Sequence, residues 1–210
     1  MAMTSEILYQ VPKNGSLATT DILDLRLLLL DLCCHLAYRE GDFVLSSGLR
    51  SSYYINGKQV TLHPQGALAV GRLLLSMLPG TTQTVAGLTL GADPIVTAVS
   101  VVSAYENQPI PALIVRKEAK GHGTMAYIEG PHLPPGAKVA VLEDVVTTGQ
   151  SAMKAVERLR QAGYIVDQVI ALVDRQQGGA ELYQSAGLQF QAVFTIAQIQ
   201  QRWQQLRSLQ

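Results

Sequence analysis

The sequence has no excess of charge of either sign, and this balance excludes several classes of protein. Charged residues make up only 15% of the 210 positions, and 16 basic residues match 16 acidic ones. A chain without net charge has no overall field that would draw it to nucleic acid or to an anionic membrane. Any anion must therefore bind to a local cluster of basic side chains, and we expect no nucleic acid and no membrane as partners.

Cysteines and long apolar runs are also scarce. The two cysteines, Cys33 and Cys34, are sequence neighbours, which suits neither a structural disulfide nor a metal site with spaced ligands. The apolar stretch 27–40 is too short to cross a bilayer and is interrupted by Asp31 and His35. The N-terminus lacks the basic start and the apolar run of a signal peptide. We therefore expect a cytoplasmic protein whose cysteines are buried and reduced.

Apolar runs alternate with helical patterns along most of the chain, which has the length of one substantial domain, residues 1–210. After a loose lead-in over residues 1–20, the expected helices are 21–38 (with Gly41 as a stop), 66–78, 93–105 and 151–163. The expected strands are 43–45 and 53–55, which would form a hairpin, and then 84–90, 111–115, 137–144 and 168–174. This alternation predicts an α/β fold with a mainly parallel central sheet flanked by helices.

Two helix boundaries have specific signals. Asp93 and Pro94 are expected to open one helix as its N-cap and first residue. The glutamine-rich segment 198–210 is expected to be a surface helix or a frayed extension.

The stretch VLEDVVTTGQS, residues 141–151, places two carboxylates, Glu143 and Asp144, where an apolar strand ends. Ligands of an open α/β sheet bind beyond the carboxyl ends of its strands. The next residues are small hydroxyl side chains and a glycine, and then a helix N-terminus whose free N–H groups favour a phosphate. Alternatively, the two acids could simply cap the helix. However, a helix needs at most one such cap, and two charges at a strand end are unfavourable unless something compensates them.

A second segment, VRKEAKGHGTMAYIEG, residues 115–130, contains the densest positive cluster. Arg116, Lys117, Lys120 and His122 lie within seven residues, and glycines flank His122. The simplest interpretation is an exposed loop whose charges are solvated. The same charges could instead neutralise a leaving group with several negative charges, while the glycines let the loop close over a substrate.

These motifs resemble a known family. Residues 141–151 resemble the signature of the type I phosphoribosyltransferases, which use phosphoribosyl pyrophosphate (PRPP), and the basic segment resembles the mobile loop of orotate phosphoribosyltransferases. The likeness extends from about Gly41 to Gly179. It implies the type I phosphoribosyltransferase fold, with a small hood at about 41–60, to which C-terminal elements could contribute, and a core at about 61–190.

The resemblance implies an activity and a set of site residues. The 5-phosphoribosyl group of PRPP would pass to orotate, giving orotidine 5′-phosphate and pyrophosphate in pyrimidine (UMP) synthesis. Lys120, Asp144 and Glu143 would be catalytic. The residues implied to bind PRPP are Arg116, Lys117, Lys120, His122, Asp144, Val145, Val146, Thr147, Thr148, Gly149, Gln150, Ser151 and Ala152. Orotate would bind to Thr148 and Arg175, whose guanidinium matches the orotate carboxylate, although Arg175 could instead be a surface arginine paired with Asp174.

The same resemblance implies a cofactor and a partner. Mg²⁺ would be held largely by pyrophosphate oxygens, without an all-protein metal site. The mobile loop would reach into a neighbouring subunit, which implies a homodimer with shared active sites. Many relatives have a lysine where this chain has Ser46 and another where it has the sequence LGADP, and Lys58 or Arg50 could substitute for them. Two alternatives remain: transfer to another nucleobase, and a non-catalytic PRPP-binding regulator.

Overall fold

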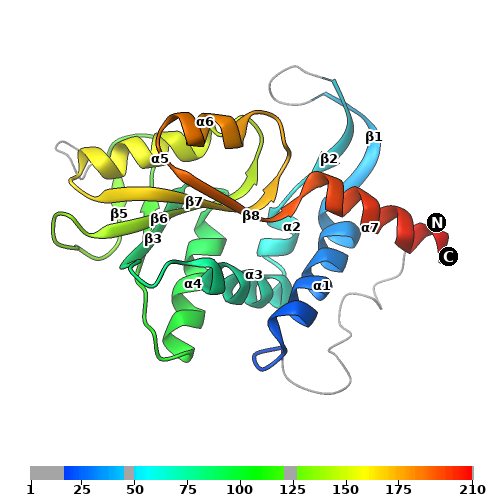
Figure 1. The fold of residues 1–210 in the computed structure, drawn as a ribbon, viewed down its shortest axis with the longest axis horizontal. Coiled ribbons are helices and arrows are strands. Elements are labelled where there is room, and N and C mark those ends of the chain that lie inside the picture. The colour runs from blue at the N-terminus through cyan, green and yellow to red at the C-terminus, as the bar shows by residue number, and fades with distance from the viewer. Residues whose placement is uncertain (1–16, 45–49, 121–126, 210) are drawn as a thin grey trace.

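A six-stranded sheet forms the centre of the computed structural model, which describes residues 17–44, 50–120 and 127–209 (Figure 1). The strands lie in the order β5-β4-β3-β6-β7-β8, and every neighbouring pair is parallel except β4 with β5. Their bounds are β3 Thr84–Leu88, β4 Ala112–Val115, β5 Ile128–Glu129, β6 Lys138–Val146, β7 Ile165–Asp174 and β8 Gln189–Thr195. The carboxyl ends of β3, β6 and β7 therefore lie along one edge of the sheet.

Helices cover both faces of this sheet, which confirms the predicted α/β class. Their bounds are α3 Pro64–Met77, α4 Asp93–Tyr105, α5 Gln150–Gln161 and α6 Gly179–Ser185. Successive residues of β6 point to opposite faces. Leu142 packs in the apolar cluster that includes Val99 of α4, and Val141 packs in the cluster that includes Val156 of α5. Burial on both faces explains why the central strands are nearly continuous apolar runs.

A smaller layer lies beside the sheet and contains both ends of the described chain (Figure 1). Its elements are α1 Ile22–Leu32, the π-helical turn η2 Cys33–Ala37, the antiparallel hairpin of β1 Tyr38–Val44 and β2 Arg50–Ile55, α2 Lys58–Thr61, and α7 Ile196–Ser208. The predicted tail is thus a helix, and a capping box at Thr195 begins it. Asp31 of α1 holds it through an ion pair with Arg202, whose Nε lies 2.6 Å from Asp31 Oδ1.

Two boundary predictions are wrong. Gly41 does not stop a helix, because the helical turns end at Ala37 and Gly41 lies inside β1. The cause is Tyr38, which is buried and pairs with Ile55 in the hairpin, so the strand begins earlier than the pattern indicates. Asp93 is not the N-cap of α4: that position is Ala92, and the Asp93 carboxylate accepts a hydrogen bond from the Thr89 hydroxyl at 2.8 Å.

Other expectations have mixed outcomes. Cys33 and Cys34 are free and buried, as predicted. No helix in the described ranges has the length and apolar character to cross a membrane. Strands β5 and β8 and helix α6 were not expected. Residues 1–16 of the lead-in and Leu45 at the expected end of the first hairpin strand lie outside the described residues.

Candidate functional site

The carboxyl edge of the sheet brings together three segments that are distant in sequence. Val146, near the end of β6, pairs with Asp174, the last residue of β7, and the Arg175 N–H donates to the Val146 carbonyl at 2.9 Å. The loop after β3 approaches the same place, because a Cβ on Gly91 would lie 2.6 Å from Asp144 Oδ1. The paired acids, the predicted phosphate loop and Arg175 therefore share one edge.

Asp144 is enclosed by residues from two other parts of the chain. It is 7% exposed, and its Oδ1 accepts a hydrogen bond from the Val145 N–H at 2.9 Å. Lys58 of α2 brings a positive charge to it, with Nζ 3.6 Å from Oδ2. Gly57 and Gly91 leave just enough room for the carboxylate, since an added Cβ would lie 3.3 Å or less from its Oδ atoms in both cases. The position of this acid is therefore closely constrained.

Glu143 lies in a different electrostatic setting from Asp144. Burial, followed by the neighbouring Asp144 charge, raises the pKa of Glu143 to about 8, against the lowering effects of Lys58 and Lys117. Its Oε2 is buried and has no hydrogen-bond partner among the described residues. Buried polar atoms are nearly always paired in folded proteins, so this unmatched oxygen indicates a place for a polar ligand or water.

The loop after Asp144 has the form expected of a phosphate site. Gly149 is the N-cap of α5 and has a φ of 81°, a left-handed conformation that favours glycine. A small cavity of about 90 Å³ lies against the loop; it is lined by Glu143, Val145, Val146, Thr147, Thr148, Gly149, Gln150, Ser151, Ala152 and Tyr183. The loop N–H groups and the start of α5 can supply hydrogen-bond donors to an anion here.

Tyr183 of α6 forms one wall of this cavity, although no pattern in the sequence indicated it. Its side chain is fully buried, its hydroxyl has no partner among the described residues, and burial raises its pKa. A Cβ on Gly149 would lie 3.0 Å from the Tyr183 ring. Tyr183 therefore supports the phosphate loop from behind, and only the helical placement of α6 could have revealed it.

The basic segment is only partly described, and its charges are not all directed at the acids. Arg116 and Lys120 both contact Glu129, at 3.3 and 3.7 Å. Lys117 lines a cavity of about 450 Å³ that also includes Ser151 at the start of α5. His122, with the flanking Gly121 and Gly123, lies outside the described residues. Of the predicted basic residues, Lys117 is the one that the structure brings toward the phosphate loop among those described.

Arg158 of α5 anchors the start of this basic segment, and the sequence pattern did not indicate it either. Its guanidinium donates to the main-chain carbonyls of Arg116 and Lys117, the latter at 2.8 Å. The same guanidinium lies 4.1 Å from the centre of the Tyr127 ring at the far end of the segment. One side chain on the helix after the phosphate loop therefore contacts both ends of the basic segment.

Arg175 is not a surface arginine. It is 7% exposed, and it donates from Nε to the hydroxyl of Tyr53 at 3.2 Å. Asp174 accepts a hydrogen bond from the Gln176 N–H. Because Arg175 is buried and bonds to Tyr53, the alternative of a surface arginine paired with Asp174 is wrong. Of the two possible substitutes for missing lysines, Lys58 reaches the acids, whereas Arg50 pairs with Asp42 in an exposed position. Ser46 lies outside the described residues.

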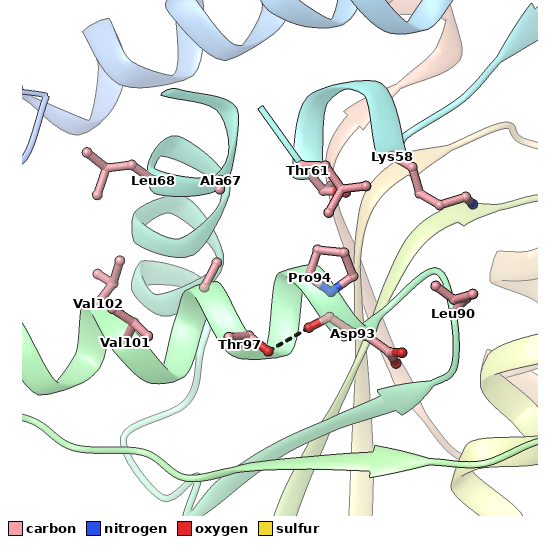
Figure 2. A pocket seen from close by; sticks show the side chains of 12 residues that line it. Lys58, Thr61, Ala67, Leu68, Leu90, Asp93, Pro94, Thr97, Val101 and Val102 are labelled. Atoms are coloured by element: carbon pink, nitrogen blue, oxygen red, sulfur yellow. Dashed lines mark hydrogen bonds between the residues drawn. The ribbon is translucent and has the colours of Figure 1, made fainter. Parts of the chain in front are cut away.

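A larger and mainly apolar cavity of about 670 Å³ lies between α2, α3 and α4 (Figure 2). Figure 2 shows Lys58 and Leu90 at one end and Val101 and Val102 at the other, with Asp93 and Thr97 between them. Asp93 Oδ2 accepts a hydrogen bond from the Thr89 hydroxyl, whereas Oδ1 is buried and has no partner among the described residues. The main-chain carbonyl of Asp93 accepts a hydrogen bond from the Thr97 hydroxyl at 2.8 Å. This cavity offers few polar groups for chemistry, but it adjoins the acid site through Lys58.

Comparison with known proteins gives consistent results. No family model matches the sequence. The chain is 80% identical over 189 residues to an orotate phosphoribosyltransferase of Nostoc sp. strain PCC 7120, which covers 90% of this chain and 92% of the relative. It is 68% identical over 191 residues to the orotate phosphoribosyltransferase of Synechocystis sp. strain PCC 6803, covering 91% and 96% of the two chains. The structure of Mycobacterium tuberculosis H37Rv orotate phosphoribosyltransferase in complex with PRPP is similar with a TM-score of 0.69 and 34% identity, over 83% of this chain and 98% of the other.

Proposed function

The chain belongs to the orotate phosphoribosyltransferase family, and from that premise we propose that the carboxyl edge of β6 and β7 is its catalytic site. The enzyme transfers the 5-phosphoribosyl group of PRPP to orotate, a step of pyrimidine biosynthesis. One observation carries the assignment of the site. An anion-binding loop, two buried acids and a buried guanidinium lie side by side at this edge.

The loop from Thr147 to Ala152 would bind the 5-phosphate of PRPP. Its cavity of about 90 Å³ lies against the N-terminus of α5, where unpaired N–H groups and the helix dipole favour negative charge. The Thr147, Thr148 and Ser151 hydroxyls add donors. Asp144, Val145 and Val146 would line the path from the phosphate to the ribose.

Asp144 and Glu143 would act on the ribose. When the bond from the anomeric carbon to pyrophosphate breaks, the electron pair leaves with pyrophosphate and the ribose carbon gains positive charge. The carboxylate of Asp144 would stabilise that charge. A ring nitrogen of orotate would then form the new bond to the carbon and release its proton to water. Because its pKa is about 8, Glu143 would remain largely protonated near neutral pH and could donate a hydrogen bond to a ribose hydroxyl.

The basic segment would take up the charge of the departing pyrophosphate. Lys117 already borders the phosphate loop at Ser151. Arg116 and Lys120 share Glu129, an exposed carboxylate that both could exchange for pyrophosphate oxygens when the segment closes. Lys120 is the proposed catalytic lysine, and His122 is proposed to join it.

Arg175 and Thr148 would hold orotate. The guanidinium is buried, and its Nη2 has no partner among the described residues. A buried charge without compensation is unfavourable, and a planar carboxylate would compensate it with two parallel hydrogen bonds. Orotate carries such a carboxylate, which favours it over nucleobases that lack one.

Mg²⁺ is proposed as the cofactor. Among the described residues, no group of three or more His, Cys, Asp or Glu side chains could hold a metal. The donors that fit are oxygens, and those of the pyrophosphate, together with water, would hold the ion. When bound, Mg²⁺ would neutralise charge on pyrophosphate.

We also propose a cytoplasmic homodimer in which residues 41–60 form a hood over the core. The dimer is supported by the mainly apolar cavity of Figure 2, because exposed apolar patches commonly mark interfaces. Val101 of α4 lines it and is 51% exposed. Val101→Glu should convert dimer to monomer in light scattering, whereas Leu23→Glu, at an exposed position of α1, should not. A monomeric parent protein would contradict the dimer.

The decisive experiment for the site assignment compares Arg175→Ala with the parent enzyme. Protein, Mg²⁺, PRPP and orotate are mixed, and loss of orotate is followed by its ultraviolet absorbance. We expect the parent to consume orotate and Arg175→Ala to lose at least about tenfold in kcat/KM for orotate. Unchanged turnover of orotate in the variant would contradict the carboxylate argument. PRPP binding without turnover by the parent would favour the regulator.

A further inference from the structure

The orientation of Arg175 depends on one residue from the hairpin. Tyr53 of β2 is 9% exposed, and its hydroxyl accepts the hydrogen bond from Arg175 Nε at 3.2 Å. The guanidinium carbon of Arg175 also lies 4.8 Å from the centre of the Tyr53 ring. The two residues are 122 positions apart in sequence, so the hairpin and the end of β7 meet at this contact.

The same contact determines which part of the guanidinium remains available. A guanidinium presents a planar fork of N–H donors, and the hydroxyl of Tyr53 occupies the Nε donor. Nη2 is buried and has no partner among the described residues. An arginine has many rotamers, and fixing one of them in advance lowers the entropic cost of binding a carboxylate.

We propose that Tyr53 is a positioning residue for orotate recognition, whose hydroxyl fixes the Arg175 fork with its terminal nitrogens free for the orotate carboxylate. The inference rests on the proposed role of Arg175 as the orotate residue. It gives the hairpin a specific role, because strand β2 delivers a hydroxyl to the base site in addition to covering it.

The support for Tyr53 extends to the C-terminal helix. The Tyr53 ring stacks on Tyr38 with a centroid distance of 6.0 Å, and Tyr38 meets Trp203 of α7 edge-on at 5.7 Å. Aromatic pairs of this kind are rigid and add stabilisation beyond their buried area. The three rings therefore connect α7 to Arg175 through successive contacts. Through Trp203, the glutamine-rich tail helps to hold Tyr53 in place.

The test is Tyr53→Phe, which removes one oxygen and keeps the ring. We expect the KM for orotate to rise about tenfold, which is the effect of losing one hydrogen bond to a charged group, while the KM for PRPP and the midpoint of thermal unfolding change little. Tyr54→Phe is the matched control, because it removes the same atom from the adjacent residue, whose ring packs on Phe43 at 5.6 Å. This control should behave like the parent.

A double-mutant cycle with Arg175→Ala separates positioning from a general structural role. If Tyr53 acts through Arg175, Tyr53→Phe has no further effect on the KM for orotate once Arg175 is absent. An unchanged KM in Tyr53→Phe, or an equal rise with and without Arg175, would overturn the inference. If Arg175→Ala alone leaves the KM unchanged, the proposed orotate site itself is wrong, which is a separate result.

Discussion

Lys58 Nζ lies 3.6 Å from Asp144 Oδ2, so the short helix after the hairpin is joined to the acid that is proposed to face the ribose. The Lys58 side chain is 44% exposed and that of Asp144 is 10% exposed. An ion pair of this exposure contributes only about 0.5 kcal/mol to stability. We therefore expect its value to be positional, because it brings a positive charge to Asp144 in a chain that has Ser46 and the LGADP sequence where many relatives have lysines.

Lys58→Gln tests whether Lys58 replaces the lysines that many relatives have at position 46 and in the loop that reads LGADP here. We expect kcat/KM for PRPP to fall about tenfold, because a charge beside the substrate is lost, with little change in the thermal midpoint. Lys138→Gln, at the opposite end of β6, is the control and should retain full activity. Equal activity of the two variants would show that Lys58 does not act on substrate.

Gly91→Ala tests how tightly the acid is held. An added Cβ would lie 2.6 Å from Asp144 Oδ1, so the carboxylate must move. Because a displacement of about 1 Å at a reacting centre can cost about 100-fold, we expect kcat to fall by about that factor. Gly80→Ala is the control, since its Cβ would meet nothing within 4 Å. A Gly91→Ala enzyme with parental kcat would contradict the placement of Asp144 at the reaction centre.

Arg158→Gln tests the anchoring of the basic segment. The change removes the donors to the carbonyls of Arg116 and Lys117, and we expect the KM for PRPP to rise about fivefold as the segment closes less readily. Arg160→Gln removes two hydrogen bonds from the same helix to the Val166 carbonyl, away from the segment. Steady-state kinetics should therefore distinguish the two variants, and an equal KM in both would refute the anchoring role.

The buried Glu143 carboxyl predicts how stability depends on pH. Its pKa is about 8 in the folded protein and 4.5 ordinarily, so between these values the folded protein retains a proton that the unfolded chain has lost. This group therefore makes the folded state less stable as pH rises from about 4.5 to 8. In Glu143→Gln the thermal midpoint should fall less between pH 5.5 and pH 8 than in the parent. The exposed Glu181→Gln should follow the parent; identical curves for all three proteins would contradict the raised pKa.

The sequence was sufficient for most of the sheet and for the position of the loop that leads from β6 into α5. Strands β3, β6 and β7 are largely buried on both faces, so they appear in the sequence as distinctive apolar runs. Glu143, Asp144 and Gly149 lie close together in the sequence, so a local pattern is enough to identify them. Strand β8 was missed because it lies at the edge of the sheet and is only partly buried.

The support for the site could not be predicted because it depends on contacts between distant segments. Tyr53 meets Arg175 across 122 positions. Lys58 and Arg50 were both candidates from the sequence, and only the tertiary structure shows that Lys58 lies beside Asp144. Tyr183 resembles any buried aromatic residue until α6 places it behind Gly149. Local patterns indicate which residues do chemistry, whereas tertiary packing determines which residues hold them in place.

A crystal structure of the enzyme with Mg²⁺ and PRPP would test the proposed site directly. We expect the 5-phosphate within hydrogen-bond distance of the Thr147–Ala152 loop, the ribose beside Asp144, and the pyrophosphate against Lys117 and Lys120. PRPP bound away from that loop, with the Thr147–Ala152 cavity holding no phosphate, would contradict it.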